Sequence, residues 1–185
     1  MQLDEIIQKR RSYRNILPFN VDKNLIVELS KAASLAPSCA NNQPWRYIFV
    51  YDKKKHEEIN SALSRGNAWA HHGGMHIVAF SKKDLDCENE GRAYYSFGTG
   101  MSFAFMMLKA TELGLVVHPM AGYDEQKVKE ILDIPSEYSV ITVAAVGKLA
   151  NEFQPFLNEK QIEQEKTRPQ RLQPEEFVFH NSYTK

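Results

Sequence analysis

The order of apolar and polar residues predicts two amphipathic helices near the start of the chain. Apolar side chains recur every three or four residues over 3–7 and again over 25–36, which places them on one face of a helix. Asp22 precedes the second segment and is a residue type that caps helix N-termini. Pro37 follows it and disfavours the helical conformation in the residue before it. We therefore expect the second helix to lie between these two residues.

Short runs rich in β-branched and aromatic residues alternate with further helical patterns in the middle of the chain. Such runs are typical of buried strands, and they occur at residues 45–51, 75–81, 115–120 and 138–149. Helical patterns separate them at 52–64, 91–114 and 124–134. Gly114 is the expected end of the longest helix. Interleaved helices and strands predict a single α/β or α+β domain spanning residues 1–185.

The last segment, residues 151–185, differs from the rest in composition. It is polar and contains three prolines, yet it carries an apolar run at Phe177–Phe179. Apolar side chains at the end of a long polar segment gain free energy only if another surface covers them. We expect this C-terminal arm to dock, with a second subunit as the expected surface.

Charge and hydropathy exclude several classes of protein. The chain has 23 basic and 23 acidic residues, so it lacks the overall positive charge of a nucleic-acid-binding protein. Its most apolar stretch, residues 97–108, is about 12 residues long, whereas a membrane-spanning helix needs roughly 20. The first residues are acidic and polar and lack the apolar core of a secretory signal. The expected location is the cytoplasm.

The two cysteines, Cys39 and Cys87, lie far apart in sequence and outside any Cys-x-x-Cys pair. This spacing argues against a zinc ribbon and against a disulfide framework. Reduced thiols are therefore expected.

A basic stretch at residues 10–14, RRSYR, is the first candidate for anion binding. Arg10 and Arg14 are four positions apart, so both side chains would share a face if the preceding helix continues. With Ser12 they would bind a phosphate through charge-assisted hydrogen bonds. The alternative is that basic residues in a last helical turn only complement the helix dipole.

The stretch APSCANNQPW, residues 36–45, is a second candidate. Ser38 and the amides of Asn41, Asn42 and Gln43 offer hydrogen-bond donors and acceptors on a turn held between two prolines. Such a set suits a polyhydroxylated chain or a ring with imide-like edges. The alternative is an Asx-rich turn whose side chains satisfy their own backbone.

Together with three further motifs, these stretches resemble the nitroreductase-like FMN-dependent oxidoreductases. The further motifs are GNAWA at 66–70, GLVVHPMAGYD at 114–124 and KTRPQRLQPEEFVF at 166–179, and all five follow the family's order. The resemblance covers nearly the whole chain. It implies an α+β fold with a central, mostly antiparallel sheet wrapped by helices, and a homodimer with two FMN sites at its interface.

The resemblance also implies the cofactor-binding residues. One chain would hold the FMN phosphate and adjoining groups with Arg10, Arg11, Ser12 and Arg14. The partner would contribute its turn, with Pro37, Ser38, Cys39, Asn41 and Gln43. The pyrimidine side of the ring would bond to Asn67, and the flavin edge would run along Pro119, Met120, Ala121 and Gly122. The tail would complete the phosphate site with Arg168 or Arg171, with Lys166 as a third candidate, because RLQPEE departs from the family's usual Arg-Lys-Pro-Leu pattern and leaves the register open.

The chemistry implied by the resemblance is that of the flavin. FMN accepts a hydride at N5 from NAD(P)H and passes it on in a ping-pong cycle to nitroaromatics, quinones or similar electron-poor acceptors. The chain lacks a GxGxxG motif after a strand, so NAD(P)H would bind transiently over the flavin. No side chain is required as catalytic acid or base, and no metal is expected. The alternatives are other flavin chemistry on the same fold, such as dehalogenation, oxidation of a specific metabolite or flavin breakdown, and an FMN-binding protein without turnover.

A histidine cluster offers a competing metal site. His72 and His76 are four positions apart and would bind zinc from one helical face, with His71 nearby. The glycines at 73–74, where the family usually has Ala-Pro, interrupt such a helix. A structural role is therefore expected, with His76 at the start of a buried strand.

Two further residues near the expected flavin are candidates for chemistry of their own. His118 would act as an acid near the acceptor, but a strand-end histidine satisfied by the backbone is the favoured interpretation. Cys39 would be redox-sensitive, but a small packing residue is the favoured interpretation there.

Overall fold

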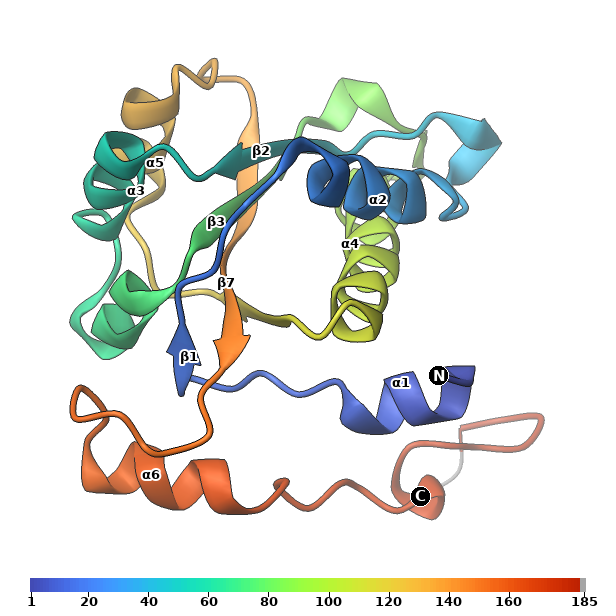
Figure 1. Cartoon of the computed structure of the whole chain (residues 1–185). Helices are drawn as coiled ribbons and strands as arrows, with labels where there is room; N and C mark the ends of the chain where they lie inside the picture. The colour runs from blue at the N-terminus through green and yellow to red at the C-terminus, as the bar shows by residue number, and fades with distance from the viewer. Residues whose placement is uncertain (184–185) are drawn as a thin grey trace.

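The centre of the molecule is an antiparallel sheet built around one long strand. The computed structural model describes residues 1–183 (Figure 1). The strands are β1 (Ile16–Leu17), β2 (Arg46–Val50), β3 (Met75–Ser81), β6 (Val116–Met120) and β7 (Ser139–Leu149). Strand β7 pairs with β3 on one side and β6 on the other, β2 pairs with the outer edge of β3, and β1 pairs with the last two residues of β7. Every pair is antiparallel, which confirms the predicted sheet.

Helices cover both faces of this sheet. They are α1 (Leu3–Lys9), α2 (Lys23–Ser34), α3 (Lys53–Asn60), α4 (Tyr95–Glu112), α5 (Glu125–Leu132) and α6 (Glu159–Lys166). Short 3-10 segments and a hairpin complete the elements: η1 (Cys39–Asn41), η2 (Arg65–His72), η3 (Lys83–Leu85), β4 (Glu88–Asn89), β5 (Arg92–Ala93) and η4 (Pro174–Glu176). Helices α2 and α4 lie on one side of the sheet, and α3 and α5 lie on the other (Figure 1). The α+β class predicted from the sequence is confirmed.

Three aspartates cap the starts of helices, and Asp22 is the one predicted from the sequence. The side chain of Asp22 accepts a hydrogen bond from the amide of Leu25, and Asp52 and Asp124 do the same at the starts of α3 and α5. An N-cap of this kind satisfies one of the amides that a helix leaves without an internal partner. Helix α2 ends at Ser34, before Pro37.

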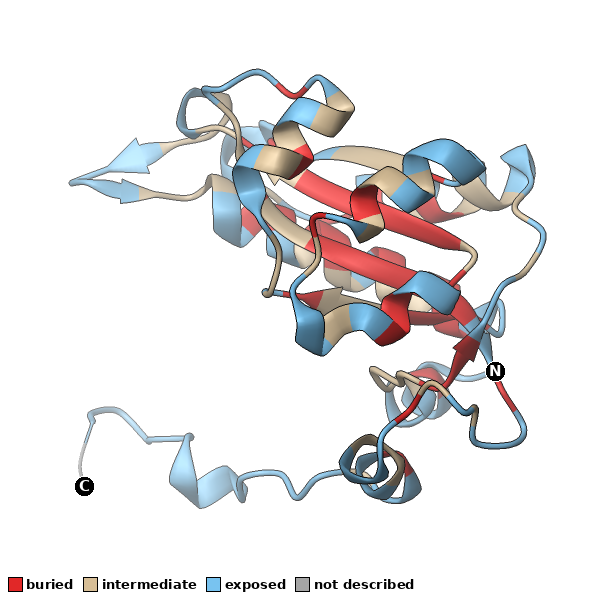
Figure 2. Cartoon of the chain, turned by 90° about the vertical axis from the view of Figure 1, so that its left-hand side faces the viewer, coloured by how far each residue is buried: buried red, intermediate tan, exposed pale blue. Residues whose placement is uncertain are grey.

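The alternation of side chains along β3 divides the core into two layers. Met75, Ile77 and Ala79 face α2 and α4, whereas Val78 faces the opposite cluster with Trp69 of η2. Successive side chains of a strand point to opposite faces, and here both faces are covered, so β3 is buried along nearly its whole length (Figure 2). This explains why its sequence reads as a continuous apolar run and not as an alternating one.

The two glycines before β3 allow chain segments to approach closely. A Cβ atom on Gly73 would lie 2.8 Å from the carbonyl oxygen of Val146, and one on Gly74 would lie 2.8 Å from the backbone nitrogen of Phe19. Real Cβ atoms do not occur at such distances from backbone, so any other residue would push the neighbouring segments apart. The glycine pair is therefore explained by packing.

Helix α1 ends before the basic stretch, and α4 begins later than the apolar pattern predicted. Helix α1 ends at Lys9, with Arg10 as its C-cap, so Arg10 and Arg14 do not share a helical face. Helix α4 begins at Tyr95 and not near Gly91, because residues 88–93 form the β4–β5 hairpin. In both places a local apolar or basic pattern continued past the point where the backbone turns.

The expectation of reduced thiols is also wrong, because Cys39 and Cys87 form a disulfide with their Cα atoms 6.0 Å apart. Cys39 lies a few residues before β2, and Cys87 lies a few residues after β3. These strands are antiparallel neighbours in which Arg46 pairs with Phe80. The start of β2 and the end of β3 therefore meet at one edge of the sheet, and long sequence separation did not mean distance in space.

The C-terminal segment lies along the chain's own N-terminal segment and then leaves it. Helix α6 packs beside residues 11–15, and beyond Arg168 every described residue is exposed (Figure 2). The apolar arm residues Phe177, Val178 and Phe179 are exposed in the single chain. The last two residues of the predicted arm, 184 and 185, lie outside the described residues. Among the helices of residues 1–183, none has the length and apolar character that crossing a bilayer requires.

A buried histidine makes the stability of the fold depend on pH. His76 is fully buried in β3, stacks on His56 with 4.4 Å between ring centroids, and lies 2.7 Å from Oδ1 of Asn60 through Nε2. Burial first, and then the neighbouring His56, lower the pKa of His76 to about 3. The unfolded chain therefore takes up a proton near pH 6.5 that the folded chain does not accept until far lower pH.

We predict that the free energy of unfolding decreases as the pH falls below about 6.5, by up to about 1.4 kcal/mol per pH unit from this group. Urea unfolding between pH 7 and pH 4.5 measures this slope. The variant His76→Gln removes this titrating group and should make the dependence shallower, with a remaining part from His118, whose pKa is also lowered. The variant His180→Gln, at an exposed position in the tail, should leave the dependence unchanged. Equal slopes in all three proteins would contradict the assignment to His76.

Candidate active site

The basic stretch of residues 10–14 lines a cleft between the N-terminal segment and the tail. Arg10, Arg11, Ser12 and Arg14 border a cavity of about 250 Å³ together with His118 of β6. The other lining residues come from the tail: Gln164, Glu165, Pro169 and Arg171. The structure thus brings the first predicted phosphate residues together with the tail.

Positive charge is concentrated in this cleft. The pKa of Arg10 is lowered by burial and then by repulsion from the guanidinium groups of Arg168 and Arg171. Nη1 of Arg10 donates a hydrogen bond to Oγ of Ser12 at 3.2 Å. Gathering like charges raises the free energy of the site unless an anion binds there. The cleft is therefore suited to a phosphate group.

The nearest carboxylate, Glu165, only partly offsets this charge. Its side chain is buried and accepts hydrogen bonds from the backbone amides of Arg14 at 3.0 Å and Asn15 at 3.4 Å. The guanidinium group of Arg14 is farther, with Nη1 at 4.0 Å from Oε1. Glu165 thus holds α6 against the basic segment.

Asn15 fastens the same segment to the residues after β7. Its side-chain amide donates to the carbonyl oxygens of Ala150 and Glu152, and its Oδ1 accepts from the amide of Gln154. Neither Asn15 nor Glu165 was identified from the sequence. The signal available for Asn15 was its position directly after the basic motif. Nothing in the sequence distinguishes Glu165 from the other polar residues of its helix.

The tail's basic side chains have different roles. Arg168 donates to the carbonyl oxygens of Gln8 at 2.6 Å and Arg10 at 2.9 Å, so it satisfies the C-terminal end of α1. Lys166 is exposed and pairs with Glu163 at 2.7 Å. Arg171 lines the cleft. Of the three tail candidates, Arg171 is the one placed to meet a bound phosphate.

The side chain of Arg11 also makes hydrogen bonds within the protein. Its guanidinium group donates to the carbonyl oxygens of Gln164 and Thr167 and lies 4.8 Å from the centre of the Tyr13 ring. It therefore ties the tail to the N-terminal segment while bordering the cleft.

His118 connects the cleft to strand β6. Its Nδ1 lies 3.0 Å from the carbonyl oxygen of Tyr13, and its ring packs on Trp69 with 4.4 Å between centroids. Burial is the main cause that lowers the pKa of His118 to about 4, and the charges of Arg14 and Arg10 add to it. The imidazole is therefore neutral at pH 7, as a donor to the backbone, which agrees with the structural role favoured from the sequence.

The residues predicted for the ring meet at the end of β6. Nδ2 of Asn67 donates to the carbonyl oxygen of Gly122 at 2.9 Å. A Cβ atom on Gly122 would collide with Oγ of Ser64 and lie 3.0 Å from Nδ2 of Asn67, so a larger residue there would displace both side chains. Pro119 and Met120 are the last residues of β6, and Ala121, which follows, is exposed. The backbone beyond β6 is therefore held by the hydrogen bond from Asn67 and is exposed to solvent at Ala121.

The turn predicted to wrap the ring is held in an uncommon backbone conformation. Ala40, Asn41 and Gln43 have positive φ angles of 47°, 59° and 51°. For residues other than glycine this left-handed region costs about 1 to 3 kcal/mol each and persists only where surrounding contacts impose it. Oγ of Ser38 accepts from the amide of Gln43 at 2.9 Å and closes the turn. The local satisfaction expected of an Asx-rich turn is therefore present.

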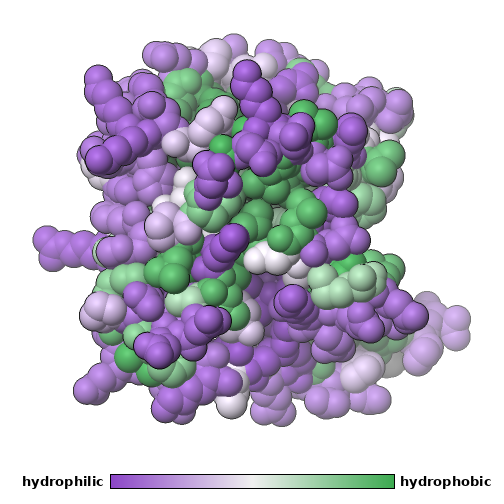
Figure 3. Space-filling model, viewed as in Figure 1, coloured by the Kyte–Doolittle hydropathy of each residue, from purple (hydrophilic) through white to green (hydrophobic). Residues whose placement is uncertain are grey.

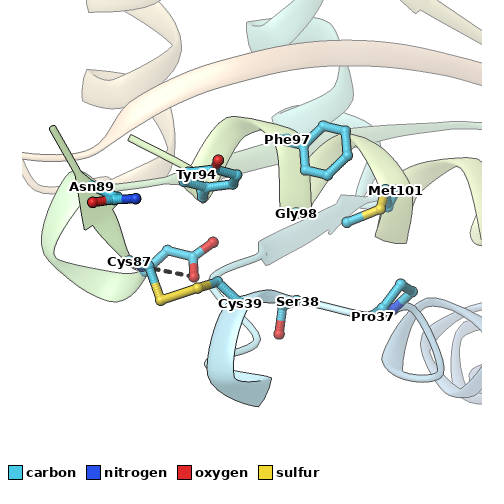
Figure 4. A pocket seen from close by; sticks show the side chains of 10 residues that line it. Pro37, Ser38, Cys39, Cys87, Asn89, Tyr94, Phe97, Gly98 and Met101 are labelled. Atoms are coloured by element: carbon cyan, nitrogen blue, oxygen red, sulfur yellow. Dashed lines mark hydrogen bonds between the residues drawn. A yellow bond between two sulfur atoms is a disulfide. The ribbon is translucent and has the colours of Figure 1, made fainter. Parts of the chain in front are cut away.

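A second cavity lies beside this turn. It has a volume of about 490 Å³ and is bordered by the turn, the disulfide and the start of α4 (Figure 4). Its lining residues are Pro37, Ser38, Cys39, Asp86, Cys87, Asn89, Tyr94, Phe97, Gly98 and Met101. Tyr94, Phe97 and Met101 were not identified from the sequence, where they read as parts of an apolar helix.

Within one chain the two halves of the predicted site lie apart. The basic segment lies beside β1, whereas the turn follows α2 at the other end of the molecule (Figure 1). The two cavities share no residue. The structure therefore brings Arg10, Ser12, Arg14 and Arg171 together, and separately joins Asn67 to Gly122, but it does not bring Pro37, Ser38, Cys39, Asn41 or Gln43 to them.

The histidines at 71–76 have separate surroundings. The ring of His72 stacks on Phe156 with 3.8 Å between centroids, while His76 lies inside the sheet. His71 is exposed at the end of η2. Their arrangement follows packing, as the structural interpretation expects.

Comparison with known proteins gives consistent matches over most of the chain. The sequence model of the Nitroreductase family matches residues 7–69 and 64–148. An NADH dehydrogenase of Thermus thermophilus is 26% identical over 178 residues, covering 80% of this chain and 86% of the relative. A 5,6-dimethylbenzimidazole synthase of Rhodospirillum rubrum is 25% identical over 170 residues, covering 78% of this chain and 81% of the relative. A crystal structure described as an oxidoreductase containing FMN superposes with a TM-score of 0.87 at 24% identity, covering 100% of this chain and 94% of that chain.

Proposed function

Because this chain belongs to the nitroreductase family and is an oxidoreductase enzyme, we propose that it is an FMN-dependent NAD(P)H oxidoreductase that works as a homodimer. The proposed acceptors are nitroaromatics, quinones and similar flat, electron-poor molecules. The observation that carries the proposal is the arginine cleft, which is bordered by His118 of β6, the strand that ends beside Asn67 and Gly122.

The residues present fit FMN. The cleft gathers guanidinium groups with little compensating negative charge, which suits the phosphate of the cofactor. At the far end of β6, Gly122 lacks a side chain and Asn67 is oriented by its hydrogen bond to that residue. The proposed phosphate site thus borders the middle of β6 at His118, and the proposed ring site lies just beyond the end of that strand at Gly122.

When bound, FMN supplies two-electron hydride chemistry at N5. The residues of this chain bind and orient it. Arg10, Arg14 and Arg171 hold the phosphate, while the neutral His118 keeps residues 10–14 in place through the carbonyl oxygen of Tyr13. No proton transfer by a side chain is needed for this cycle, in keeping with the half-buried and neutral state of His118.

The separation of the turn from the cleft supports the dimer. Each ring would be covered by the turn of the other subunit, since the two halves lie apart in one chain (Figure 1). Exposed apolar side chains are available for the contact at Leu3 and Ile7 of α1, Phe97 and Phe105 of α4, and Phe177–Phe179 of the arm. Hydrophobic residues also gather over the position of α4 in Figure 3. Patches of this kind mark interaction surfaces.

The second candidate is other flavin chemistry on the same fold. The similarity to a 5,6-dimethylbenzimidazole synthase favours it. Such an enzyme would bind FMN in the same cleft but would not turn over NAD(P)H with quinones.

We predict that the purified, dialysed protein is yellow with one FMN per chain. Anaerobic addition of NADH or NADPH should bleach the flavin, and a quinone added afterwards should restore the oxidised spectrum, as the ping-pong cycle requires. Absorption spectroscopy in the visible range measures both steps. A flavin that stays oxidised would favour the second candidate, and a colourless protein that takes up no FMN would refute the proposal.

For the phosphate cleft, we predict that Arg171→Ala weakens FMN binding by about 1.5 to 3 kcal/mol, the usual contribution of a charged hydrogen bond. Lys166→Ala should leave the affinity unchanged, because Lys166 pairs with Glu163 on the surface. Quenching of FMN fluorescence on titration into apo protein measures the affinity. Riboflavin lacks the phosphate, so it should bind wild type and Arg171→Ala equally; a loss confined to Lys166→Ala would assign the phosphate to that residue.

Complementation between subunits tests the shared site. Arg14→Ala removes a phosphate contact from one half, and Ser38→Trp fills the ring space from the other half, so each variant alone should retain little FMN. A heterodimer of the two variants contains one site built from two intact halves. It should bind FMN at about half the wild-type stoichiometry. No recovery in a purified heterodimer would place both halves in one chain.

A further inference from the structure

The disulfide lies where the predicted flavin turn meets the start of α4. Cys39 belongs to the turn, and Cys87 lies between η3 and the β4–β5 hairpin. Both border the cavity of about 490 Å³, and Figure 4 shows their sulfur atoms joined beneath Tyr94. Cys39 is exposed and Cys87 is half-buried. A small thiol can therefore reach the bond from the side of Cys39.

The surroundings of Cys87 suit it as the sulfur that leaves. Nδ2 of Asn42 lies 3.4 Å from the Sγ atom of Cys87, within donor distance of that sulfur. The same amide donates to Oδ1 of Asp86 at 3.3 Å, and the amide of Cys87 donates to that oxygen at 2.9 Å. Asn42 is thus positioned to donate a hydrogen bond to Cys87 Sγ when that atom leaves as a thiolate, which offsets repulsion from the nearby carboxylate of Asp86.

The backbone of the turn is expected to change conformation once the disulfide is reduced. Three of its residues have positive φ angles without being glycine, and this conformation persists only under outside constraint. The disulfide links the middle of the turn to the segment after β3. Hydrogen bonds also hold the turn. They include the amide of Gln43 to Oγ of Ser38, Asn42 to Asp86, and Arg46 to the carbonyl oxygen of Gln43 at 3.1 Å.

We propose that Cys39–Cys87 is a thiol–disulfide exchange site for dithiol reductants, and that its redox state sets how firmly the turn holds the cofactor of the partner subunit. The second half of this proposal rests on the proposed FMN function. The first half stands on the two sulfur atoms, their exposure and their polar neighbours.

The exchange is balanced in atoms and electrons. A thiolate of the dithiol attacks Sγ of Cys39, a new S–S bond forms between them, and Cys87 leaves as a thiolate. The second sulfur of the dithiol, as its thiolate, then attacks the first dithiol sulfur, which is bonded to Cys39 in the mixed disulfide. Cys39 leaves as a thiolate. Two protons from the dithiol complete the two protein thiols. The reductant becomes a cyclic disulfide, and the protein gains two electrons.

The chain's composition makes the test direct, because Cys39 and Cys87 are its two cysteines. Protein purified in air without reductant should show no titratable thiol after unfolding, and a dithiol such as dithiothreitol, followed by its removal, should yield two thiols per chain. Two thiols before any reductant is added would overturn the exchange site, as would a bond that resists the dithiol in the folded protein. This count needs no cofactor, so it is independent of the proposed function.

The effect on the turn is measured by the release of FMN. Reduction should speed FMN dissociation about tenfold, which corresponds to about 1.4 kcal/mol. The variant Cys87→Ser, outside the predicted flavin contacts, should release FMN at the rate of reduced wild type and should not respond to the dithiol. Equal release before and after reduction of wild type would overturn the control of the turn. A protein that binds no FMN would instead refute the proposed function, while the thiol count would still decide the exchange site.

Discussion

The pairing of β7 with strands on both of its sides is the interaction on which the rest of the structure depends. Its residues Val143 and Val146 pair with β3 on one side and with β6 on the other. The register with β6 places Pro119–Gly122 at one end of the sheet, and the register with β1 holds the segment that follows the arginines. A one-residue slip along β7 would move each of its buried side chains from one core layer to the other. The two parts of the proposed cofactor site are therefore positioned by one strand.

Electrostatics gives the arginine cleft its character. Arg10, Arg168 and Arg171 repel one another, and the nearby Glu165 is occupied by backbone amides of residues 14 and 15. Arg168 and Arg11 join the tail to the N-terminal segment by donating hydrogen bonds to backbone carbonyl oxygens. These acceptors carry no net charge, so they do not neutralise the guanidinium groups. The cleft is thereby held together by hydrogen bonds to the backbone while its positive charge stays available for a ligand.

The turn at residues 37–43 is a different kind of element. Its polar side chains close the turn, and its backbone is held in the left-handed region at three positions. Such a segment depends on neighbours that lie outside it, here the disulfide, Asp86 and the start of α4. The same neighbours form the wall of the larger cavity, so the conformation of the turn and the shape of that cavity are coupled.

The sequence by itself determined the strands, most of the helices and the family motifs, because these depend on local periodicity, capping residues and short spacings. Asp22 and Pro37 bounded α2, and the apolar runs located β2, β3, β6 and β7. Tertiary structure decided what depends on pairing between distant segments. The antiparallel pairing of β2 with β3 brought Cys39 to Cys87, and close contacts with Phe19 and Val146 required Gly74 and Gly73. It also decided which tail arginine lines the cleft, because residues so far apart in sequence meet only after the chain folds, and no local pattern records that meeting.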